Sequence, residues 1–536
     1  LKACGLVQAV DKGKEVHQEI INKGLLEKHA VLGNALVDMY AKCGALMKAQ
    51  QILRELPVQD VISWNALISG YSQHGQGHEA LSCFERMQRE GLSPDTVTYT
   101  CTLKACGSVG AVEKGREIHD EIVCRGLVEK KLKLGNALVN MYAKCGVIVE
   151  ARKVMESLCV RDIVSWNALI SGYAQEGKGH EAIKCFGDMR RKKLPPNEVT
   201  FACILKACGS IRDISKGKQI HDEIIREGLL EKSIVLGNAL VDMYAKCGAL
   251  TKAQDLLDEL TMRNIVSWNA LISGYSKLGK VRRALTCFCR MQTECLFPNE
   301  VTFTCILKAC GMGGAIDKGK KMHDEIIIRD LLLKSALLGT ALVDMYAKCG
   351  SLEKAQKVLE EISVCNVSSW NALMQGYIEH EQFYEALDCF TWMKRNRISP
   401  NETTFVCVLK ACGSIGAFEK GKKIHDKLIH TGFLKESVVL GNVLVDMYAK
   451  CGVLEKAHEV LLKIPIRSII SWNALIVGYA QAGQSHEVLN TLAHIQKDGI
   501  SPNEVTILHV LKACSQLGKL REAEMYYENM SKDYHI

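Results

Sequence analysis

Apolar residues recur along the chain with the spacing of an amphipathic helix. Trp64, Leu67 and Tyr71 fall at i, i+3 and i+7, which places them on one face of a helix. Gly75 follows this stripe, where a glycine in the left-handed conformation would end the helix. A second stripe over residues 80–87 has the same spacing and stops before a Gly-Leu-Ser-Pro turn. The pattern predicts two short helices joined by a turn, and no alternating strand pattern accompanies it.

This two-helix pattern repeats along the whole chain. The same tryptophan returns every 102 residues, at Trp64, Trp166, Trp268, Trp370 and Trp472. Each period divides into three related repeats of 35, 36 and 31 residues, of which 61–95, 96–131 and 132–162 form one set. We expect a partial 36-residue repeat over residues 1–29, tandem repeats over 30–503 and a partial terminal repeat over 504–536.

One such hairpin cannot bury its own apolar stripe, but stacked neighbours bury a continuous core. We therefore predict an all-α, superhelical α-solenoid of about sixteen helix-turn-helix repeats with a long concave face. Apolar residues make up 48% of the chain, which excludes wholesale disorder. No apolar run approaches the ~18 residues of a membrane span. The formal net charge of +8 permits an anionic partner without requiring one.

The fifth position of the 31- and 35-residue repeats holds an asparagine, with Thr340 as the one exception. Next to each core tryptophan, as at Asn65, it points about 100° away from the apolar stripe. The ten positions are Asn34, Asn65, Asn136, Asn167, Asn238, Asn269, Thr340, Asn371, Asn442 and Asn473. An amide near a helix start is an N-cap candidate. An amide also carries a donor and an acceptor, which suits recognition of a base edge.

The last residue of the same repeats is always short and polar. The series is Asp60, Asp95, Asp162, Asn197, Asn264, Asn299, Asn366, Asn401, Ser468 and Asn503. Turn chemistry alone favours Asp, Asn and Ser, so this position taken by itself leaves the turn interpretation open.

Two recurring phrases, Trp-Asn-Ala-Leu-Ile-Ser-Gly-Tyr and Asn-Ala-Leu-Val-Asp-Met-Tyr-Ala-Lys-Cys-Gly, closely resemble pentatricopeptide repeat proteins. The alternation of 35, 36 and 31 residues is similar to the P-, L- and S-type repeats of their plant PLS subclass. A tetratricopeptide solenoid has a uniform period and a different consensus. The resemblance implies a right-handed superhelix that binds single-stranded RNA, one base per repeat, in a plastid or mitochondrion.

In the family the fifth and last residues of a repeat recognise the base, and we call them the base-reading pair. Asn with Asp resembles the uridine pair, Asn with Asn a pyrimidine pair, Thr340 with Asn366 an adenine pair and Asn442 with Ser468 a cytidine pair. The 36-residue repeats depart from the code, with fifth residues Thr100, Ala202, Thr304 and Val406. With N for any base and Y for a pyrimidine, residues 30–503 predict 5′-UUN UYN YYN AYN CY-3′.

Family members also hold each base between aliphatic side chains at the second residue of successive repeats. Val31, Ile62, Val164, Val235, Val266, Val439 and Ile470 fit this role. Lys133, Leu337 and Ser368 depart from it. An aliphatic residue at a helix start is also a candidate for a hydrophobic staple.

Other chemistry finds less support. Lysines at 42, 144, 246, 348 and 450 suit phosphate contact or a helix C-terminus. The 24 cysteines recur in register without a Cys-x-x-Cys, so we expect buried thiols and no metal. His119, His221 and His323 open a His-x-Glu like that of zinc deaminases, but the cysteine half of that site is missing, so a structural role is expected. No cofactor, membrane or small-molecule substrate is indicated.

The sequence therefore predicts a sequence-specific RNA-binding protein that marks sites for organellar RNA processing, above all C-to-U editing. The resemblance also implies editing-factor proteins bound to the 36-residue repeats. Catalysis is not expected, because a deaminase would need a C-terminal domain that is not visible in this sequence. The opening within a repeat suggests a fragment that lacks its targeting peptide. The alternatives are a protein-binding scaffold, which has no need of an Asp/Asn/Ser series, and an enzyme, for which no catalytic set is found.

Overall fold

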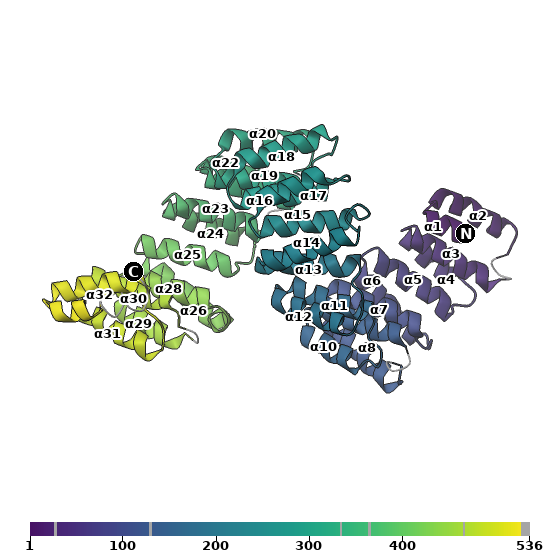
Figure 1. Cartoon of the computed structure of the whole chain (residues 1–536), viewed down its shortest axis with the longest axis horizontal. Helices are drawn as coiled ribbons and strands as arrows, with labels where there is room; N and C mark the ends of the chain where they lie inside the picture. The colour runs from purple at the N-terminus through teal and green to yellow at the C-terminus, as the bar shows by residue number, and fades with distance from the viewer. Residues whose placement is uncertain (26–28, 128–130, 333–334, 363–365, 465–466, 527–536) are drawn as a thin grey trace. The chain divides into compact units, whose positions relative to one another are not determined.

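The computed structural model describes residues 1–25, 29–127, 131–332, 335–362, 366–464 and 467–526 (Figure 1). All regular secondary structure within these residues is α-helical. The chain divides into two compact units, Leu1–Gly274 and Tyr275–Ile536. None of the described helices is at once long and apolar enough to cross a membrane.

The first compact unit holds eight hairpins and the start of a ninth. Its helices are α1 (Lys2–Val7), α2 (Val10–Asn22), α3 (Ala30–Lys42), α4 (Leu46–Glu55), α5 (Val61–Gln73), α6 (Gly77–Arg89), α7 (Thr96–Val109), α8 (Val112–Cys124), α9 (Leu132–Lys144), α10 (Ile148–Ser157), α11 (Ile163–Gln175), α12 (Gly179–Arg191), α13 (Glu198–Ile211), α14 (Ile214–Arg226), α15 (Ile234–Lys246) and α16 (Leu250–Glu259), followed by α17 (Ile265–Lys277).

The second compact unit continues the alternation. Its helices are α18 (Val281–Thr293), α19 (Glu300–Met312), α20 (Ile316–Ile328), α21 (Ala336–Lys348), α22 (Leu352–Glu361), α23 (Val367–Glu379), α24 (Phe383–Arg395), α25 (Glu402–Ser414), α26 (Phe418–Thr431), α27 (Phe433–Glu436), α28 (Val438–Lys450), α29 (Leu454–Lys463), α30 (Ile469–Gln481), α31 (Ser485–Lys497) and α32 (Glu504–Gln516). The four-residue α27 is the one element that the hairpin pattern does not predict.

Within each unit the helices form two rows. The first helix of every hairpin packs on the first helix of the next, as in α3, α5, α7 and α9. Each second helix packs on its own first helix and on the following one, as α6 does on α5 and α7 (Figure 1). This is the stacked-hairpin arrangement of an α-solenoid, and the predicted all-α solenoid is confirmed.

The predicted apolar stripes form the core. Trp64, Leu67 and Ile68 of α5 are fully buried, as are Phe84 and Met87 of the adjacent α6. Gly75 and Gly91, which follow these helices, have φ of 75° and 80°, so the predicted left-handed helix ends are confirmed.

Neighbouring first helices lie close together at positions occupied by glycine. A Cβ added to Gly70 of α5 would lie 2.6 Å from the Cβ of Ala41 and 3.2 Å from its Cα, both on α3. Because the closest atom belongs to alanine, a side chain without rotamers, and the alanine backbone lies just beyond it, this contact cannot relax cheaply. Glycine at this position therefore sets the spacing of the first-helix row.

Candidate nucleic-acid interface

A groove of about 630 Å³ runs across four consecutive first helices of the first compact unit, α7, α9, α11 and α13. Its lining includes the predicted base-reading residues Asn136, Asp162 and Asn167 and the predicted base-sandwiching Val164. Two cations, Lys104 and Lys133, lie in the same lining. The structure thus brings together side chains that come from three successive repeats.

The fifth and last residues of a repeat contact each other directly. The Nδ2 of Asn34 donates to both carboxylate oxygens of Asp60, at 3.1 and 2.9 Å. Asn136 donates to both oxygens of Asp162 in the same way, at 3.1 and 3.0 Å. In the 35-residue repeat Asn65 donates to Oδ1 of Asp95 at 3.0 Å.

The pairs that combine two asparagines in 35-residue repeats have the same geometry. The fifth-residue Nδ2 donates to the last-residue Oδ1 at 3.1 Å for Asn167 and Asn197, 2.9 Å for Asn371 and Asn401, and 2.8 Å for Asn473 and Asn503. Asn269 and Asn299 fall in different compact units: Asn269 is buried on α17, and Asn299 caps α19.

Three predicted pairs differ from this geometry. Ser468 donates its hydroxyl to Oδ1 of Asn442 at 3.2 Å. Thr340 reaches Asn366 only through Ser369, whose hydroxyl lies 2.7 Å from that of Thr340 and 3.1 Å from Oδ1 of Asn366. No hydrogen bond joins the Asn238 and Asn264 side chains within the described residues, and Oδ1 of Asn238 is buried without a partner.

The last residue of a repeat is also the N-cap of the next first helix. Asp95 Oδ1 accepts from the backbone N–H of Val97 at 2.9 Å and of Thr98 at 2.8 Å. Asn197 Oδ1 accepts from the N–H of Thr200 at 3.0 Å. The capping interpretation therefore applies to the last residue, and it is wrong for the fifth, because the N-cap of α5 is Asp60 and not Asn65.

Capping decides which atom of the last residue is left for a ligand. A helix N-terminus offers only N–H donors, so an oxygen always turns toward it. An aspartate then keeps a second oxygen, a pure acceptor, whereas an asparagine keeps its NH₂, a pure donor. Capping the helix and contacting a ligand use different terminal atoms of the same Asp or Asn side chain, so one residue can do both.

The capping contacts also hold the aspartates in their ionised form. Burial acts to raise the pKa of Asp60, but the hydrogen bonds from the Ser63 N–H and the Asn34 amide outweigh it, and the pKa lies below its ordinary value. The pKa of Asp95 is lowered against burial in the same way, by the Thr98 N–H and the Asn65 amide. Both carboxylates are therefore hydrogen-bond acceptors at neutral pH.

Sequence reasoning missed a third polar residue at this site. The third residue of the following repeat is Thr98, Thr200, Thr302, Thr404 or Thr506 after 35-residue repeats and Ser63, Ser165, Ser267, Ser369 or Ser471 after 31-residue repeats. Thr98 Oγ1 donates to Oδ1 of Asn65 at 2.6 Å, whereas Ser63 Oγ donates to the backbone carbonyl of Asp60 at 2.8 Å. The strict alternation of Thr and Ser, three residues after an Asp, Asn or Ser, was the available signal.

The predicted base-sandwiching residues lie at the surface. Val31, Ile62, Val164, Val235, Val266, Val439 and Ile470 are each about half exposed or more, with Val235 least exposed at 49% and Val31 most at 77%. A packed hydrophobic staple would bury them, so the staple interpretation is disfavoured. The 36-residue repeats add Val97, Val199, Val301 and Val505 at the same position, which the sequence analysis left out.

Four of the five recurring lysines are paired. Lys42 forms an ion pair with Asp38, one helical turn earlier, at 2.6 Å. Lys246, Lys348 and Lys450 each form an ion pair with an aspartate in the same position. Asn140 replaces this aspartate ahead of Lys144. The His-x-Glu histidines have a structural contact, since Nδ1 of His119, His221 and His323 lies 3.0 Å from the hydroxyl of Tyr142, Tyr244 and Tyr346 respectively.

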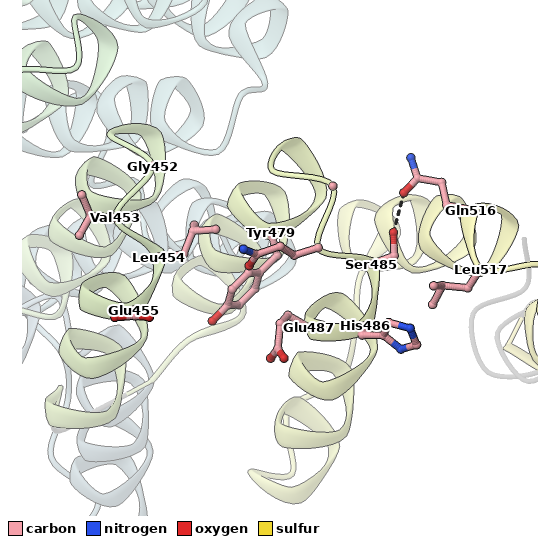
Figure 2. Close-up of a pocket in the computed structure, with 12 residues that line it drawn as sticks. Gly452, Val453, Leu454, Glu455, Tyr479, Ser485, His486, Glu487, Gln516 and Leu517 are labelled. Carbon is pink, nitrogen blue, oxygen red and sulfur yellow. Dashed lines mark hydrogen bonds between the residues drawn. The ribbon is translucent and has the colours of Figure 1, made fainter.

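A larger cavity lies elsewhere. It has a volume of about 1050 Å³ and is lined by hairpin turns and helix starts, including Leu454, Tyr479, His486 and Glu487. Figure 2 shows Ser485 bonded across its rim to Gln516, at 2.6 Å. None of the predicted base-reading residues lines it.

Comparison with known proteins agrees with this geometry. Models of the PPR repeat family match residues 59–108, 161–210, 263–312, 365–414 and 467–516, and PPR repeat models match 97–127, 238–265, 301–331, 340–367, 442–468 and 505–534. Together these matches cover more than half of the chain.

Relatives from Arabidopsis thaliana match almost throughout. A chloroplastic pentatricopeptide repeat-containing protein is 32% identical over 100% of this chain and 61% of its own length. A mitochondrial one is 34% identical over 100% of this chain and 52% of its own. A third is 35% identical, with 97% of this chain and 71% of the relative covered. The chain thus spans half to three quarters of the length of these relatives.

Among solved structures, the pentatricopeptide repeat protein PPR10 from maize matches 99% of this chain and 82% of its own, with a TM-score of 0.55 and 20% identity. The same protein in complex with an 18-nt psaJ RNA element matches 92% of this chain and 83% of its own, also at a TM-score of 0.55 and with 18% identity. The repeat length, the stacked hairpins and the matching family models lead to one conclusion: the chain belongs to the pentatricopeptide repeat family.

Proposed function

We propose that this protein binds single-stranded RNA in a sequence-specific manner, with one base facing each base-reading pair of a 31- or 35-residue repeat. The observation that carries the proposal is the groove over α7, α9, α11 and α13, where Asn136, Asp162 and Asn167 stand beside Val164 and two lysines. Polar groups for base edges, aliphatic surface for base faces and cations for phosphates are the three elements of single-strand recognition.

The capping geometry gives the base preference a chemical basis. The uracil N3–H is a donor at the point where cytosine N3 is an acceptor. The outward oxygen of Asp95 or Asp162 accepts from uracil and repels cytosine, and the outward NH₂ of Asn197 or Asn401 donates to cytosine N3 or to a carbonyl of either pyrimidine. Facing Asn366, the acceptor N1 of adenine fits the same NH₂ group.

The fifth residue supports the last one. Asn65 and Asn167 are each only 8% exposed, and their amides hold the last residue by a hydrogen bond. Such a held side chain loses little further freedom when a base binds, which favours affinity. Maize PPR10, which shares the fold, forms a complex with an 18-nt RNA element.

The repeat lengths support a finer proposal. From the alternation of 31, 35 and 36 residues over 30–503, with partial repeats over 1–29 and 504–536, we infer that the chain is of the PLS subclass. Its role would then be to mark a site in an organellar transcript for processing, above all C-to-U editing, with editing-factor proteins bound to the 36-residue repeats. The repeats act by binding, and deamination would be carried out by another domain or protein.

Binding to RNA tests the proposal directly. The purified chain is titrated against a fourteen-nucleotide RNA of the predicted sequence and against a scrambled RNA of the same composition, at equal salt, because phosphate contacts alone give salt-dependent affinity for any sequence. We expect the predicted RNA to bind at least tenfold more tightly. Equal affinities would show that the groove, if it binds RNA, does so without recognising bases.

A further inference from the structure

The threonine or serine that follows each base-reading pair differs between the two repeat lengths in what its hydroxyl contacts. We propose that this third residue of the following repeat is a specificity-determining residue: threonine locks the fifth-residue amide and sharpens discrimination between pyrimidines, and serine leaves it unlocked. The inference rests on the proposed function and deepens it.

Threonine holds the amide oxygen in every 35-residue pair that lies within one compact unit. The hydroxyl donates to the fifth-residue Oδ1 at 2.6 Å from Thr98 to Asn65, 2.7 Å from Thr200 to Asn167, 2.8 Å from Thr404 to Asn371 and 2.7 Å from Thr506 to Asn473. These threonines are completely buried. Oδ1 of the last residue is the more distant acceptor for the same hydroxyl, at 2.9–3.0 Å. With its oxygen held by the hydroxyl at the shorter distance and its nitrogen held by the last residue, the amide has one orientation.

Serine directs its hydroxyl elsewhere. Ser63, Ser165, Ser267 and Ser471 donate to the backbone carbonyl of the N-cap residue at 2.8 Å in each case. As a consequence Oδ1 of Asn34, Asn136 and Asn238 is buried without a hydrogen-bond partner. β-Branched threonine has fewer χ1 rotamers than serine, and the fifth and last residues are 30 positions apart before threonine but 26 apart before serine. The two hydroxyls settle on different acceptors.

The effect of an absent lock depends on the last residue. Where that residue is Asp60 or Asp162, the carboxylate accepts the amide NH₂ and repels its oxygen, so the amide orientation is still defined. Asn238 has neither a threonine nor an aspartate, and no hydrogen bond joins it to Asn264 within the described residues. Its amide is free to turn either its oxygen or its nitrogen toward a base.

Two base-reading pairs of this chain can therefore be compared directly. The Asn167–Asn197 pair, locked by Thr200, presents only N–H donors, which match the acceptor N3 of cytosine and conflict with the N3–H of uracil. The Asn238–Asn264 pair, followed by Ser267, accommodates both pyrimidines. The two pairs have the same residues at the fifth and last positions, so the pair alone predicts no difference between them.

The experiment measures cytosine-to-uracil affinity ratios at the fifth and seventh nucleotides of the fourteen-nucleotide RNA, which face these two pairs. We expect the wild-type ratio to be higher at the fifth. Thr200→Val, which keeps the shape and removes the hydroxyl, lowers the ratio at the fifth nucleotide by roughly fivefold, the effect of one hydrogen bond, and Thr200→Ser lowers it in the same direction. Ser267→Thr raises the ratio at the seventh nucleotide.

The outcomes separate the two proposals. If wild-type protein does not distinguish the predicted RNA from its scramble, the proposed function itself fails. If it does distinguish them, but ratios at the fifth and seventh nucleotides stay unchanged in all three variants, only the lock is refuted. A purely structural role of Thr200 would weaken binding of both RNAs equally and lower the melting temperature, leaving the ratio at its wild-type value, which also refutes the lock.

Discussion

Replacing Asp95 with asparagine should change the base preference of one repeat while leaving its fold intact. Asparagine and aspartate are equally good N-caps, and Asn197 caps the corresponding helix of the next 35-residue repeat through the backbone N–H of Thr200. We therefore expect the unfolding free energy to change by less than about 0.5 kcal/mol. The group facing the base changes from a carboxylate oxygen to an NH₂ group.

The size of the switch follows from the hydrogen bond that is exchanged. Bonds to a charged group contribute about 1.5–3 kcal/mol, and Asp95 is an exposed side chain, which places it at the lower end. The uracil-to-cytosine affinity ratio at the second nucleotide should fall by roughly tenfold or more. The effect should be confined to that nucleotide, since the hydrogen bonds of Asp95 in the described part of the chain join it to Asn65, Val97 and Thr98 and to no other base-reading pair.

Fluorescence anisotropy with four RNAs, differing only at the second nucleotide, measures the ratio, and thermal unfolding followed by circular dichroism measures stability. Asp95→Ala is the control: it removes the cap, which costs about 1 kcal/mol, and should bind uracil and cytosine alike. An Asp95→Asn protein that keeps the wild-type melting temperature and the wild-type ratio would show that the last residue does not contact the base.

Three further predictions follow from the packing and the charges. Gly70→Ala should destabilise its hairpin by about 1–3 kcal/mol, because the new Cβ would lie 2.6 Å from that of Ala41. Gly187→Ala of α12, whose new Cβ would have nothing within 4 Å, should instead stabilise the protein by up to about 1 kcal/mol. Melting temperatures that shift in the same direction for both variants would contradict this. Burial lowers the pKa of His119, His221, His323 and His425 below the ordinary histidine value of about 6.5, so the native state binds fewer protons than the unfolded state. Stability should be complete above about pH 6.5 and decline as the pH falls through the native pKa values. A melting temperature that is flat or rising from pH 7 to 5 would contradict this. Lys104→Ala should weaken binding of all RNA sequences equally and reduce the salt dependence of affinity by about one ion, while a change in base preference would mean that Lys104 contacts a base.

Much of the fold could be predicted because the apolar pattern, the helix-ending glycines and the repeat period all indicate the same structure. The stripe through Trp64 and Leu67, the helix-ending Gly75 and the 102-residue period all require stacked hairpins, and the structure has them. Helix α27 was not predicted, since four residues are too few to show a periodic pattern.

The sequence predicts which residues form the candidate site but not which hydrogen bonds join them. The recurrence of Asn136 and Asp162 gives their spacing, yet only coordinates show that one oxygen of Asp162 caps α11 while both oxygens accept from Asn136. The hydroxyls of Thr98 and Ser63 have different acceptors, Oδ1 of Asn65 and the backbone carbonyl of Asp60. Periodicity carries no information on such choices.

A structure of the chain bound to the fourteen-nucleotide RNA tests the central claim most directly. The account predicts that the strand follows the row of first helices, with the base of the fourth nucleotide against Asp162 and Val164 and the phosphates toward Lys104 and Lys133. A strand bound along the second helices, or bases turned away from Asp162 and Asn197, would contradict it.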